Sequence, residues 1–280
     1  MGTLYLVATP IGNLEDISQR AIHILKNSAL IAAEDTRVTR KLLARHDIHV
    51  PLLSYNEHNH LTRVEVILQT LKSGDVSVVS DAGTPGLNDP GSMIVKIAIE
   101  NGFAVSPIPG ACAPISALVA SGLPTDAFLY LGYLPRRQKD RLTLLESVRH
   151  LPYTLIFLET PHRLLDSLND LLLVLGDRYL ACARELTKIH EEIKRGGVSA
   201  LLAYFRQNEP RGEFTLVIAG AKTLANQLSE EEIFLEIRAG VENKIPAGEL
   251  ARKLSAVTGI ARRDLYQKIL MVQTQMAESD

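Results

Sequence analysis

Tryptophan is absent from the 280-residue chain, and aromatic residues make up only 5% of it. Proteins that hold single-stranded nucleic acid by base stacking need exposed aromatic rings, so this composition argues against an aromatic stacking surface. Cysteine is scarce as well, with Cys112 and Cys182 as the only two. Two cysteines are too few for a disulfide framework and lack the spacing of metal ligands. We therefore expect a protein without a metal site.

A strong charge of one sign is missing too. The chain has 30 lysine and arginine residues against 32 aspartate and glutamate residues, a formal net charge of -2. An indiscriminate nucleic-acid binder would be strongly basic, and an acidic disordered protein would be strongly negative. Local basic surfaces are compatible with this balance.

Long apolar runs do not occur. No segment reaches the roughly 18–20 consecutive apolar residues that cross a bilayer. The N-terminus leads directly into a strand-like segment with no basic stretch or cleavage site before it. We expect a cytoplasmic protein that does not engage a membrane.

What the first 220 residues do contain is an alternation of apolar runs and amphipathic stretches. This pattern predicts an α/β protein built from βαβ units with a mainly parallel sheet. A boundary near Gly122-Leu123-Pro124-Thr125 divides it into two α/β lobes, 1–121 and 122–225. Strands are expected at 3–8, 29–33, 76–80 and 104–108 in the first lobe, and at 128–131, 154–158, 179–183 and 214–219 in the second. Two lobes joined by a short hinge favour a ligand cleft between them.

The remaining residues, 226–280, show only helical patterns. Helices are expected at 229–240, 246–256 and 261–275, and the last two resemble a helix-turn-helix. We therefore predict a small all-helical module at the C-terminal end.

Loops rich in glycine, proline and small polar residues follow the three strongest strands of the first lobe. They are Thr9–Asn13, Ser80–Gly91 and Pro107–Ala113. Ligands of α/β sheets bind beyond the carboxyl ends of the strands, and small residues let a ligand approach the backbone. Any one of these loops could be an ordinary turn, but three at one sheet edge indicate a binding site. The sequence has neither a dinucleotide-binding G-x-G-x-x-G after the first strand nor a P-loop.

The motifs in these loops resemble one family. Ala8-Thr9-Pro10-Ile11-Gly12-Asn13, Ala33-Glu34-Asp35-Thr36-Arg37, Ser80-Asp81-Ala82-Gly83-Thr84-Pro85-Gly86, Asp89-Pro90-Gly91 and Pro107-Ile108-Pro109-Gly110 occur in order, followed by Glu159-Thr160-Pro161-His162-Arg163, Arg184-Glu185-Leu186-Thr187-Lys188 and Gly212-Glu213-Phe214-Thr215. Together they are similar to the ribosomal RNA small subunit methyltransferase I family, over nearly the whole chain.

This resemblance implies a two-lobed tetrapyrrole-methylase fold, that of class III methyltransferases. It also implies methyl transfer from S-adenosylmethionine to the ribose 2′-oxygen of a decoding-region cytidine in 16S rRNA, with the small ribosomal subunit as partner and a homodimer as the assembly. The residues that it assigns to the cofactor are Pro10, Asp81, Ala82, Thr84, Cys112, Ala113, Glu159, Leu186 and Ala219.

Methyl transfer from a sulfonium needs positioning and a proton acceptor rather than a metal or a covalent intermediate. The candidate catalytic residues are Asp35, Arg37, Glu185 and Lys188. Lys188 could serve as a base if burial near Arg184 lowered its pKa, or Lys188 and Arg37 could hold phosphate. The alternative for Asp35 is a helix N-cap. The residues alone leave the base open.

RNA contact requires positive charge. Basic residues cluster after the first strand of the second lobe and in the C-terminal module, at Arg136, Arg137, Lys139, Arg141, Lys253, Arg262 and Arg263. Each cluster could also be a solvated helix face. Two other functions remain open at this point, namely a tetrapyrrole methylase of the same fold and a ligand-sensing regulator that binds nucleic acid.

Overall fold

The computed structural model describes residues 1–89, 91–221, 230–243, 245–258 and 260–277. Residues Met1–Ser147 and Tyr153–Ala219 form one compact unit, and Val148–Pro152 and Gly220–Asp280 belong to a second. No helix in the described ranges is long and apolar enough to cross a membrane.

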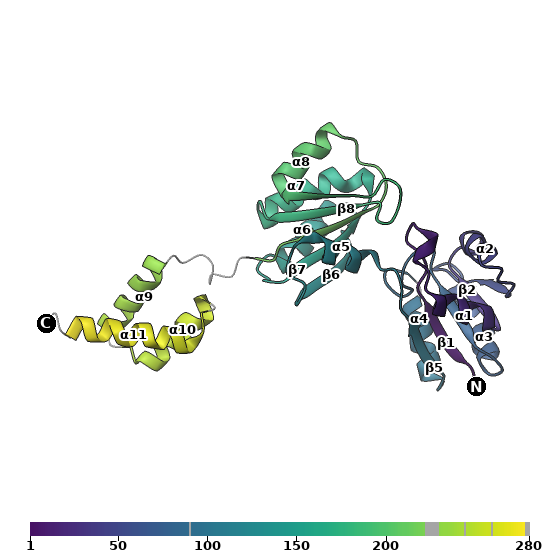
Figure 1. The fold of residues 1–280 in the computed structure, drawn as a ribbon, viewed down its shortest axis with the longest axis horizontal. Helices are drawn as coiled ribbons and strands as arrows, with labels where there is room; N and C mark the ends of the chain where they lie inside the picture. The colour runs from purple at the N-terminus through teal and green to yellow at the C-terminus, as the bar shows by residue number, and fades with distance from the viewer. Residues whose placement is uncertain (90, 222–229, 244, 259, 278–280) are drawn as a thin grey trace. The chain divides into compact units, whose positions relative to one another are not determined.

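The first unit begins with a parallel sheet of five strands (Figure 1). Its spatial order is β3 (Leu52–Ser54), β2 (Leu30–Ala33), β4 (Val76–Val79), β1 (Thr3–Val7) and β5 (Ala104–Ile108). Strands β2 and β4 are buried at every position. A strand covered on both faces needs such an unbroken apolar run, which is why the sequence signal is clear here.

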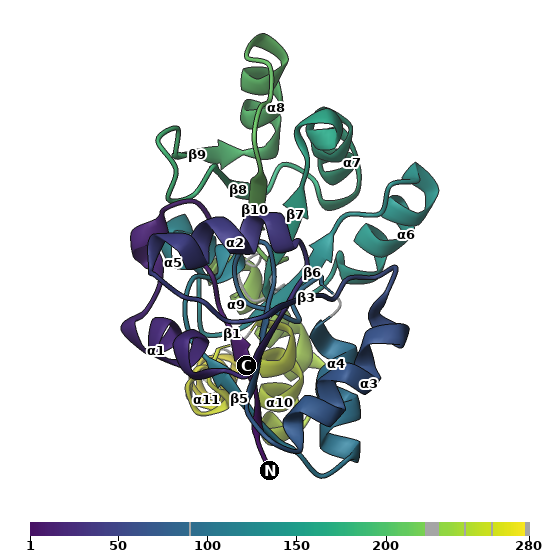
Figure 2. The same cartoon turned by 90° about the vertical axis from the view of Figure 1, so that its right-hand side faces the viewer.

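Helices cover both faces of this sheet. On one face, α1 (Gln19–Asn27) and α2 (Thr36–Arg45) pack in a core with Val7 and Ile31. On the other face, α3 (His60–Leu71) and α4 (Gly91–Glu100) pack with Leu4 and Val78. Figure 2 shows α1 on one side of the sheet and α3 and α4 on the opposite side.

The second sheet has the order β6 (Phe128–Tyr133), β7 (Thr154–Glu159), β10 (Phe214–Ile218), β8 (Tyr179–Arg184) and β9 (Glu192–Gly197). Only β6 and β7 pair in parallel, and the other three pairings are antiparallel. The expectation of a mainly parallel sheet is therefore wrong for this half of the unit. It fails because β8 and β9 form a hairpin and β10 inserts between β7 and β8, which apolar periodicity does not reveal.

Helices α6 (Gln138–Val148), α7 (Leu164–Leu175) and α8 (Val198–Gln207) accompany this second sheet. Helix α5 (Ala113–Ser121) follows directly from β5 of the first sheet. It buries Ala117 and Leu118 against Ala181 and Ala183 of β8 in the second sheet. Helix α5 thus links the two sheets, because it follows the last strand of the first sheet in sequence but packs against the second sheet.

The second unit contains three helices in its described part, α9 (Glu230–Glu242), α10 (Ala247–Thr258) and α11 (Arg262–Ala277). They share a small apolar core that includes Ile237, Ala251, Leu265 and Ile269. The predicted helices are confirmed within two residues at their described ends. The predicted boundary at residue 226 lies outside the described residues.

Candidate functional site

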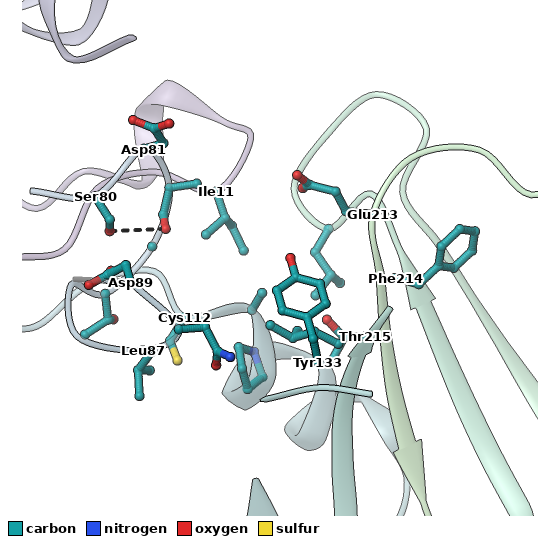
Figure 3. Close-up of a pocket in the computed structure, with 18 of the residues that line it drawn as sticks. Ile11, Ser80, Asp81, Leu87, Asp89, Cys112, Tyr133, Glu213, Phe214 and Thr215 are labelled. Carbon is teal, nitrogen blue, oxygen red and sulfur yellow. Dashed lines mark hydrogen bonds between the residues drawn. The ribbon is translucent and has the colours of Figure 1, made fainter. Parts of the chain in front are cut away.

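A cavity of about 230 Å³ lies in the first unit, between loops of its two sheets. Figure 3 shows Ile11, Asp81 and Cys112 on one side of it and Tyr133, Glu213 and Thr215 on the other. Its lining comprises Ile11, Glu34, Ser80, Asp81, Ala82, Gly83, Thr84, Leu87, Asn88, Asp89, Cys112, Ala113, Pro114, Tyr130, Tyr133, Leu158, Glu159, Ala183, Leu186, Glu213, Phe214 and Thr215. We call this cavity the central pocket.

The first wall is built from the loops that follow β1, β4 and β5. Thr9 and Gly83 exchange backbone hydrogen bonds of 2.9 and 3.0 Å, so the first two loops are joined to each other. The Thr84 hydroxyl donates to the carbonyl of Ala111 at 3.1 Å, which joins the third loop. Gly83 has φ +82°, a left-handed conformation that favours glycine. The loops that the sequence singled out therefore do converge at one edge of the sheet.

Two carboxylates of the pocket, Glu34 after β2 and Asp81 after β4, each accept a hydrogen bond from a backbone amide. The Asp81 amide donates to Oε2 of Glu34 at 3.2 Å, and the Asp35 amide donates to Oδ1 of Asp81 at 2.9 Å. Burial is the main cause that raises the pKa of both Glu34 and Asp81; repulsion from Asp81 adds to it for Glu34, and repulsion from Asp35 adds to it for Asp81. Both carboxylates line the central pocket, where they hold negative charge close to any ligand.

Asp35 points to a different task. Its carboxylate caps the first turn of α2 by accepting from the Arg37 amide at 2.8 Å, and it pairs with the Arg37 guanidinium at 2.6 Å. These hydrogen bonds to Arg37 lower the pKa of Asp35 to about 2. Such a carboxylate is a weak base at neutral pH, so the helix-cap alternative describes what Asp35 does in this structure.

The second wall comes from β6, β7, β8 and β10 and the loop after β8. Glu159 lines the pocket, but its carboxylate is already bound by the Arg163 guanidinium at 2.8 Å and by the Ser167 hydroxyl at 2.6 Å. Leu186 also lines the pocket. Glu185 and Thr187, on either side of it, have φ values of +50° and +66°. Strained non-glycine residues of this kind cluster at functional sites.

Lys188 lies between two carboxylates. Its Nζ is 2.9 Å from Oε1 of Glu185 and 3.0 Å from Oε2 of Glu213. Partial burial acts to lower the pKa of Lys188, but the two carboxylates outweigh it and the pKa is raised. Burial acts to raise the pKa of Glu185, but hydrogen bonds from Lys188 and from the Glu213 amide outweigh it, so the pKa of Glu185 is lowered. The expectation of a Lys188 base with a lowered pKa is thus contradicted, because its partners are acids and not Arg184.

The structure separates the residues assigned to the cofactor into two groups. Seven of them line the central pocket: Asp81, Ala82, Thr84, Cys112, Ala113, Glu159 and Leu186. Pro10 is buried immediately before Ile11, the loop residue that reaches the cavity.

Ala219 does not line the central pocket. It follows the far end of β10, where its amide donates to Tyr179 at 2.9 Å, whereas Phe214 at the start of β10 lines the pocket. Five residues of strand separate the two by about 17 Å. Because β10 runs antiparallel to β7 and β8, its carboxyl end lies at the sheet edge opposite the central pocket, and the structure does not bring Ala219 together with the other assigned residues.

The sequence is similar to those of known proteins. A family model of tetrapyrrole (corrin/porphyrin) methylases matches residues 3–202. Curated proteins named ribosomal RNA small subunit methyltransferase I are similar over nearly their whole length. The one from Synechocystis sp. is 46% identical over 98% of this chain and 99% of its own, and the one from Halalkalibacterium halodurans is 45% identical over 95% and 93%. The one from Escherichia coli O157:H7 is 43% identical over 97% and 96%. This chain belongs to that family.

Solved structures support the same fold at low sequence identity. A uroporphyrin-III C-methyltransferase from Thermus thermophilus has a TM-score of 0.55 and 20% identity, covering 78% of this chain and 97% of that chain. A diphthine synthase has a TM-score of 0.61 and 15% identity, covering 78% and 90%. These likenesses confirm the two-lobed tetrapyrrole-methylase-like fold, and the structure itself shows the predicted C-terminal helices.

Several pocket residues of this family member were missed by the sequence reasoning. Glu34, Asp89 and Glu213 line the cavity and stand inside the motifs that carried the family resemblance. Their positions inside these motifs could have pointed to them, but the sequence analysis assigns Asp35 and Glu185, from the same group of motifs, as the catalytic candidates. Asn88 and Tyr130 are joined across the pocket by a 2.6 Å hydrogen bond from the tyrosine hydroxyl, a pairing that the sequence does not signal.

The basic residues around α6 divide into exposed and buried ones. Arg136, Arg137 and Lys139 are exposed. Arg141 is buried, and its guanidinium pairs with Asp170 of α7 at 2.6 Å. Arg141 is therefore not part of the candidate RNA surface, because its guanidinium is buried and paired with Asp170.

The three candidate basic residues of the helical unit are exposed, but two of these three already have partners. Lys253 pairs with Glu249 one turn earlier at 3.0 Å, and the Arg262 guanidinium donates to the Gly248 carbonyl at 3.3 Å. Arg263 is exposed at the start of α11. These residues stay candidates for RNA contact.

Proposed function

We propose that this chain transfers a methyl group from S-adenosylmethionine to the ribose 2′-oxygen of a decoding-region cytidine in 16S rRNA. The observation that carries the proposal is identity of 39–46% over nearly the full length of curated relatives named ribosomal RNA small subunit methyltransferase I. The central pocket supplies a site of suitable chemistry.

The charges of the pocket fit a cationic methyl donor. Five carboxylate residues line it, while no lysine, arginine or histidine is found among the described residues of its lining. Glu159 and Glu213 are paired with Arg163 and Lys188, which leaves three lining acids with no ion pair among the described residues: Glu34, Asp81 and Asp89. A sulfonium and an ammonium group are stabilised by such a field, since opposite charges attract strongly in a partly desolvated cleft.

The residues of the chain contribute binding and orientation. Ala82, Gly83 and Ala113 have small or no side chains, so a ligand can reach the backbone groups of the loops. Asp81 and Thr84 sit in one loop held by hydrogen bonds to its neighbours. When bound, the donor supplies an already activated methyl group, and positioning is then the main requirement on the protein.

Glu34 is the residue that best fits the role of proton acceptor for the ribose hydroxyl. A general base works best when its pKa lies near the operating pH. The pKa of Glu34 is raised by burial, whereas that of Asp35 is lowered to about 2 and that of Lys188 is raised, which keeps its amine protonated. Glu34 also lines the pocket, and Asp35 does not.

The test combines donor binding with methyl transfer. Calorimetry with S-adenosylmethionine should show binding to the wild-type protein and weakened binding to Asp81→Ala. The matched control is Asp126→Ala, an exposed loop aspartate, which should bind as the wild type does. Labelled donor should then methylate small ribosomal subunits that lack the modification, with the label on a cytidine 2′-oxygen.

The outcomes discriminate between the functions considered. Transfer to a tetrapyrrole in place of RNA would assign the chain to the other activity of this fold. Donor binding without any transfer would indicate a ligand-sensing regulator. Absence of donor binding would overturn both methyltransferase assignments.

The setting of the reaction follows the same proposal. We expect a homodimer that acts in the cytoplasm on the assembled small subunit. Light scattering after size-exclusion chromatography tests the dimer, and a comparison of naked 16S rRNA with intact subunits as acceptors tests the substrate form.

A further inference from the structure

Helix α2 concentrates positive charge more than any surface considered so far. Its ten residues, Thr36–Arg45, include Arg37, Arg40, Lys41 and Arg45 and no acidic residue. All four basic residues are exposed, and the opposite side of the helix packs Leu42 and Leu43 into the core beneath the sheet. The charges therefore face outward from a chain whose formal net charge is -2.

Three of these charges have no internal partner. Arg37 pairs with Asp35, but Arg40, Lys41 and Arg45 make no ion pair within the part of the chain that the structure describes. An ordinary solvated helix offsets its cations with acids one turn away, as Lys253 and Glu249 do in α10. The arrangement on α2 lacks that compensation, so it suits an external polyanion.

The position of α2 connects this charge to the central pocket. The helix begins after Asp35, whose amide is bonded to the pocket residue Asp81 at 2.9 Å. At its other end, Arg45 and His46 line a second groove of about 920 Å³. Ten helical residues span about 15 Å, so α2 runs from the rim of the pocket to this groove.

The groove and the pocket share a wall. Ile11 and Leu186 line the central pocket, and the next residues, Gly12 and Thr187, line the groove. The Asn13 amide donates to the Thr187 hydroxyl at 3.0 Å, which joins the two loops that form this wall. Gly12 is required there, because a Cβ atom would lie 2.4 Å from Cγ of Lys188 and 3.0 Å from the Leu186 carbonyl.

The far side of the groove is chemically suited to a nucleic acid strand. It contains His190 beside Ile189, which is 98% exposed, whereas the ammonium of Lys188 there is already paired with Glu185 and Glu213. Unpaired RNA is recognised through its phosphates by basic side chains and through its bases by apolar or planar ones. A nucleotide of an unpaired strand can be splayed out into a pocket, whereas a duplex holds its riboses along the shallow minor groove, so an unpaired strand is the matching form.

We propose that the exposed face of α2, together with the groove at its C-terminal end, binds an unpaired strand of ribosomal RNA and leads its target ribose to the central pocket. The identity of the RNA rests on the proposed function, while the binding surface rests on charge and on continuity with the pocket. The phosphates lie along Arg40, Lys41 and Arg45.

The test is a charge-neutral variant with a control from the same sheet. The triple substitution Arg40→Gln, Lys41→Gln, Arg45→Gln removes three positive charges from exposed positions, where such changes leave folding intact. The control is Arg63→Gln, Lys72→Gln, Lys96→Gln, which also removes three exposed positive charges. Arg63 lies in α3, Lys72 directly follows α3 and Lys96 lies in α4, and these helices cover the opposite face of the sheet. Both full-length variants are compared with the wild type.

Three measurements are made on each protein: S-adenosylmethionine binding by calorimetry, binding of protein-free 16S rRNA as a function of salt, and methyl transfer to small subunits. Each phosphate contact on a single strand contributes about 0.7 to the slope of log affinity against log salt. The α2 variant should therefore show a slope shallower by about 2 and, at 0.15 M salt, an affinity about 50-fold lower. Its donor affinity should be unchanged, its KM for subunits raised and its kcat retained.

Equal RNA affinity and salt slope in the α2 variant and the wild type would overturn the inference. An equal loss in the control variant would also overturn it, since the effect would then be one of overall charge. A loss confined to intact subunits, with naked rRNA bound normally, would assign α2 to a ribosomal protein and refute the RNA contact. These readings need no methyl transfer, so failure of the proposed function, seen as no transfer by the wild type, is recognised separately.

Discussion

Replacing Arg141 by methionine should destabilise the first unit and leave RNA binding unchanged. The side chains of Arg141 and Asp170 are only 5% and 4% exposed, and their Nη2 and Oδ2 atoms are 2.6 Å apart. The Arg141 Nε also donates to Asp170 Oδ2 at 2.7 Å, and its Nη1 donates to the Pro135 carbonyl at 3.1 Å. Methionine keeps most of the aliphatic stem and removes the charge.

The magnitude follows from what remains around Asp170. After the substitution, the Gln138 amide at 2.9 Å is the remaining side-chain donor to this carboxylate among the contacts described. Removing one partner of a buried ion pair costs about 3–5 kcal/mol, because the other charge stays buried without compensation. In a unit of this size each kcal/mol lowers Tm by about 2–4 °C, so we expect a fall of about 10 °C in thermal unfolding followed by circular dichroism.

Two further variants give this prediction its controls. Arg141→Met with Asp170→Leu removes both charges and should recover most of the lost stability, since an apolar pair of similar volume replaces a buried ion pair at little cost. Lys139→Met changes an exposed neighbour and should leave Tm unchanged. An Arg141→Met protein with wild-type Tm but weaker, less salt-dependent RNA binding would refute the packing argument and restore Arg141 to the RNA surface.

Three other perturbations have defined outcomes. Glu34→Gln keeps an oxygen for the Asp81 amide but removes the base and one pocket charge, so kcat at saturating donor should fall by about 10²–10⁴-fold and donor affinity should fall as well; retained kcat would reject Glu34 as the base. Gly12→Ala forces apart the loops at the shared wall and should weaken donor binding and cost about 1–3 kcal/mol of stability, measured by calorimetry and urea unfolding. Because the folded-state pKa of Asp35 is lowered to about 2, its stabilisation is complete above its unfolded pKa of about 4 and is lost as the pH falls toward 2. Asp35→Asn should therefore reduce the free energy of unfolding at pH 7, and a difference from the wild type that persists at pH 2 would contradict this.

The strands of the core were predictable from the sequence, and the edge strands were not. Strands β2 and β4 are buried throughout, so each appears as an unbroken apolar run. Strand β3 has three residues, all half-buried, and β9 reads Glu-Ile-Lys-Arg-Gly-Gly. Edge strands such as these carry no periodic apolar signal, because their pairing depends on a neighbour that is distant in sequence.

The parts of the site formed by Gly- and Pro-containing loops were predictable from the sequence. The parts that depend on strand direction or on side-chain burial were not. Loops with Gly and Pro at strand ends correctly indicated the first wall of the central pocket, since these residues favour turns through their own backbone conformations. The position of Ala219 away from the central pocket could not be predicted, because no local feature tells whether a strand is parallel to its neighbours. Arg141 failed because an arginine facing an aspartate 29 residues away looks, in sequence, like one facing solvent.

The distribution of charge explains how a chain with a formal net charge of -2 can hold both a cation and a polyanion. The pocket gathers acids, which would repel RNA phosphates, while α2 gathers bases, which would repel a sulfonium. The two fields meet at Asp35 and Arg37, whose ion pair stands between Asp81 and the outer turns of α2. Since interactions at the surface are screened within about 10 Å at 0.1 M salt, a helix about 15 Å long is sufficient to keep its distal charges from weakening the pocket. An enzyme that joins a cationic donor to an anionic acceptor needs this separation, because a single mixed surface would bind neither well.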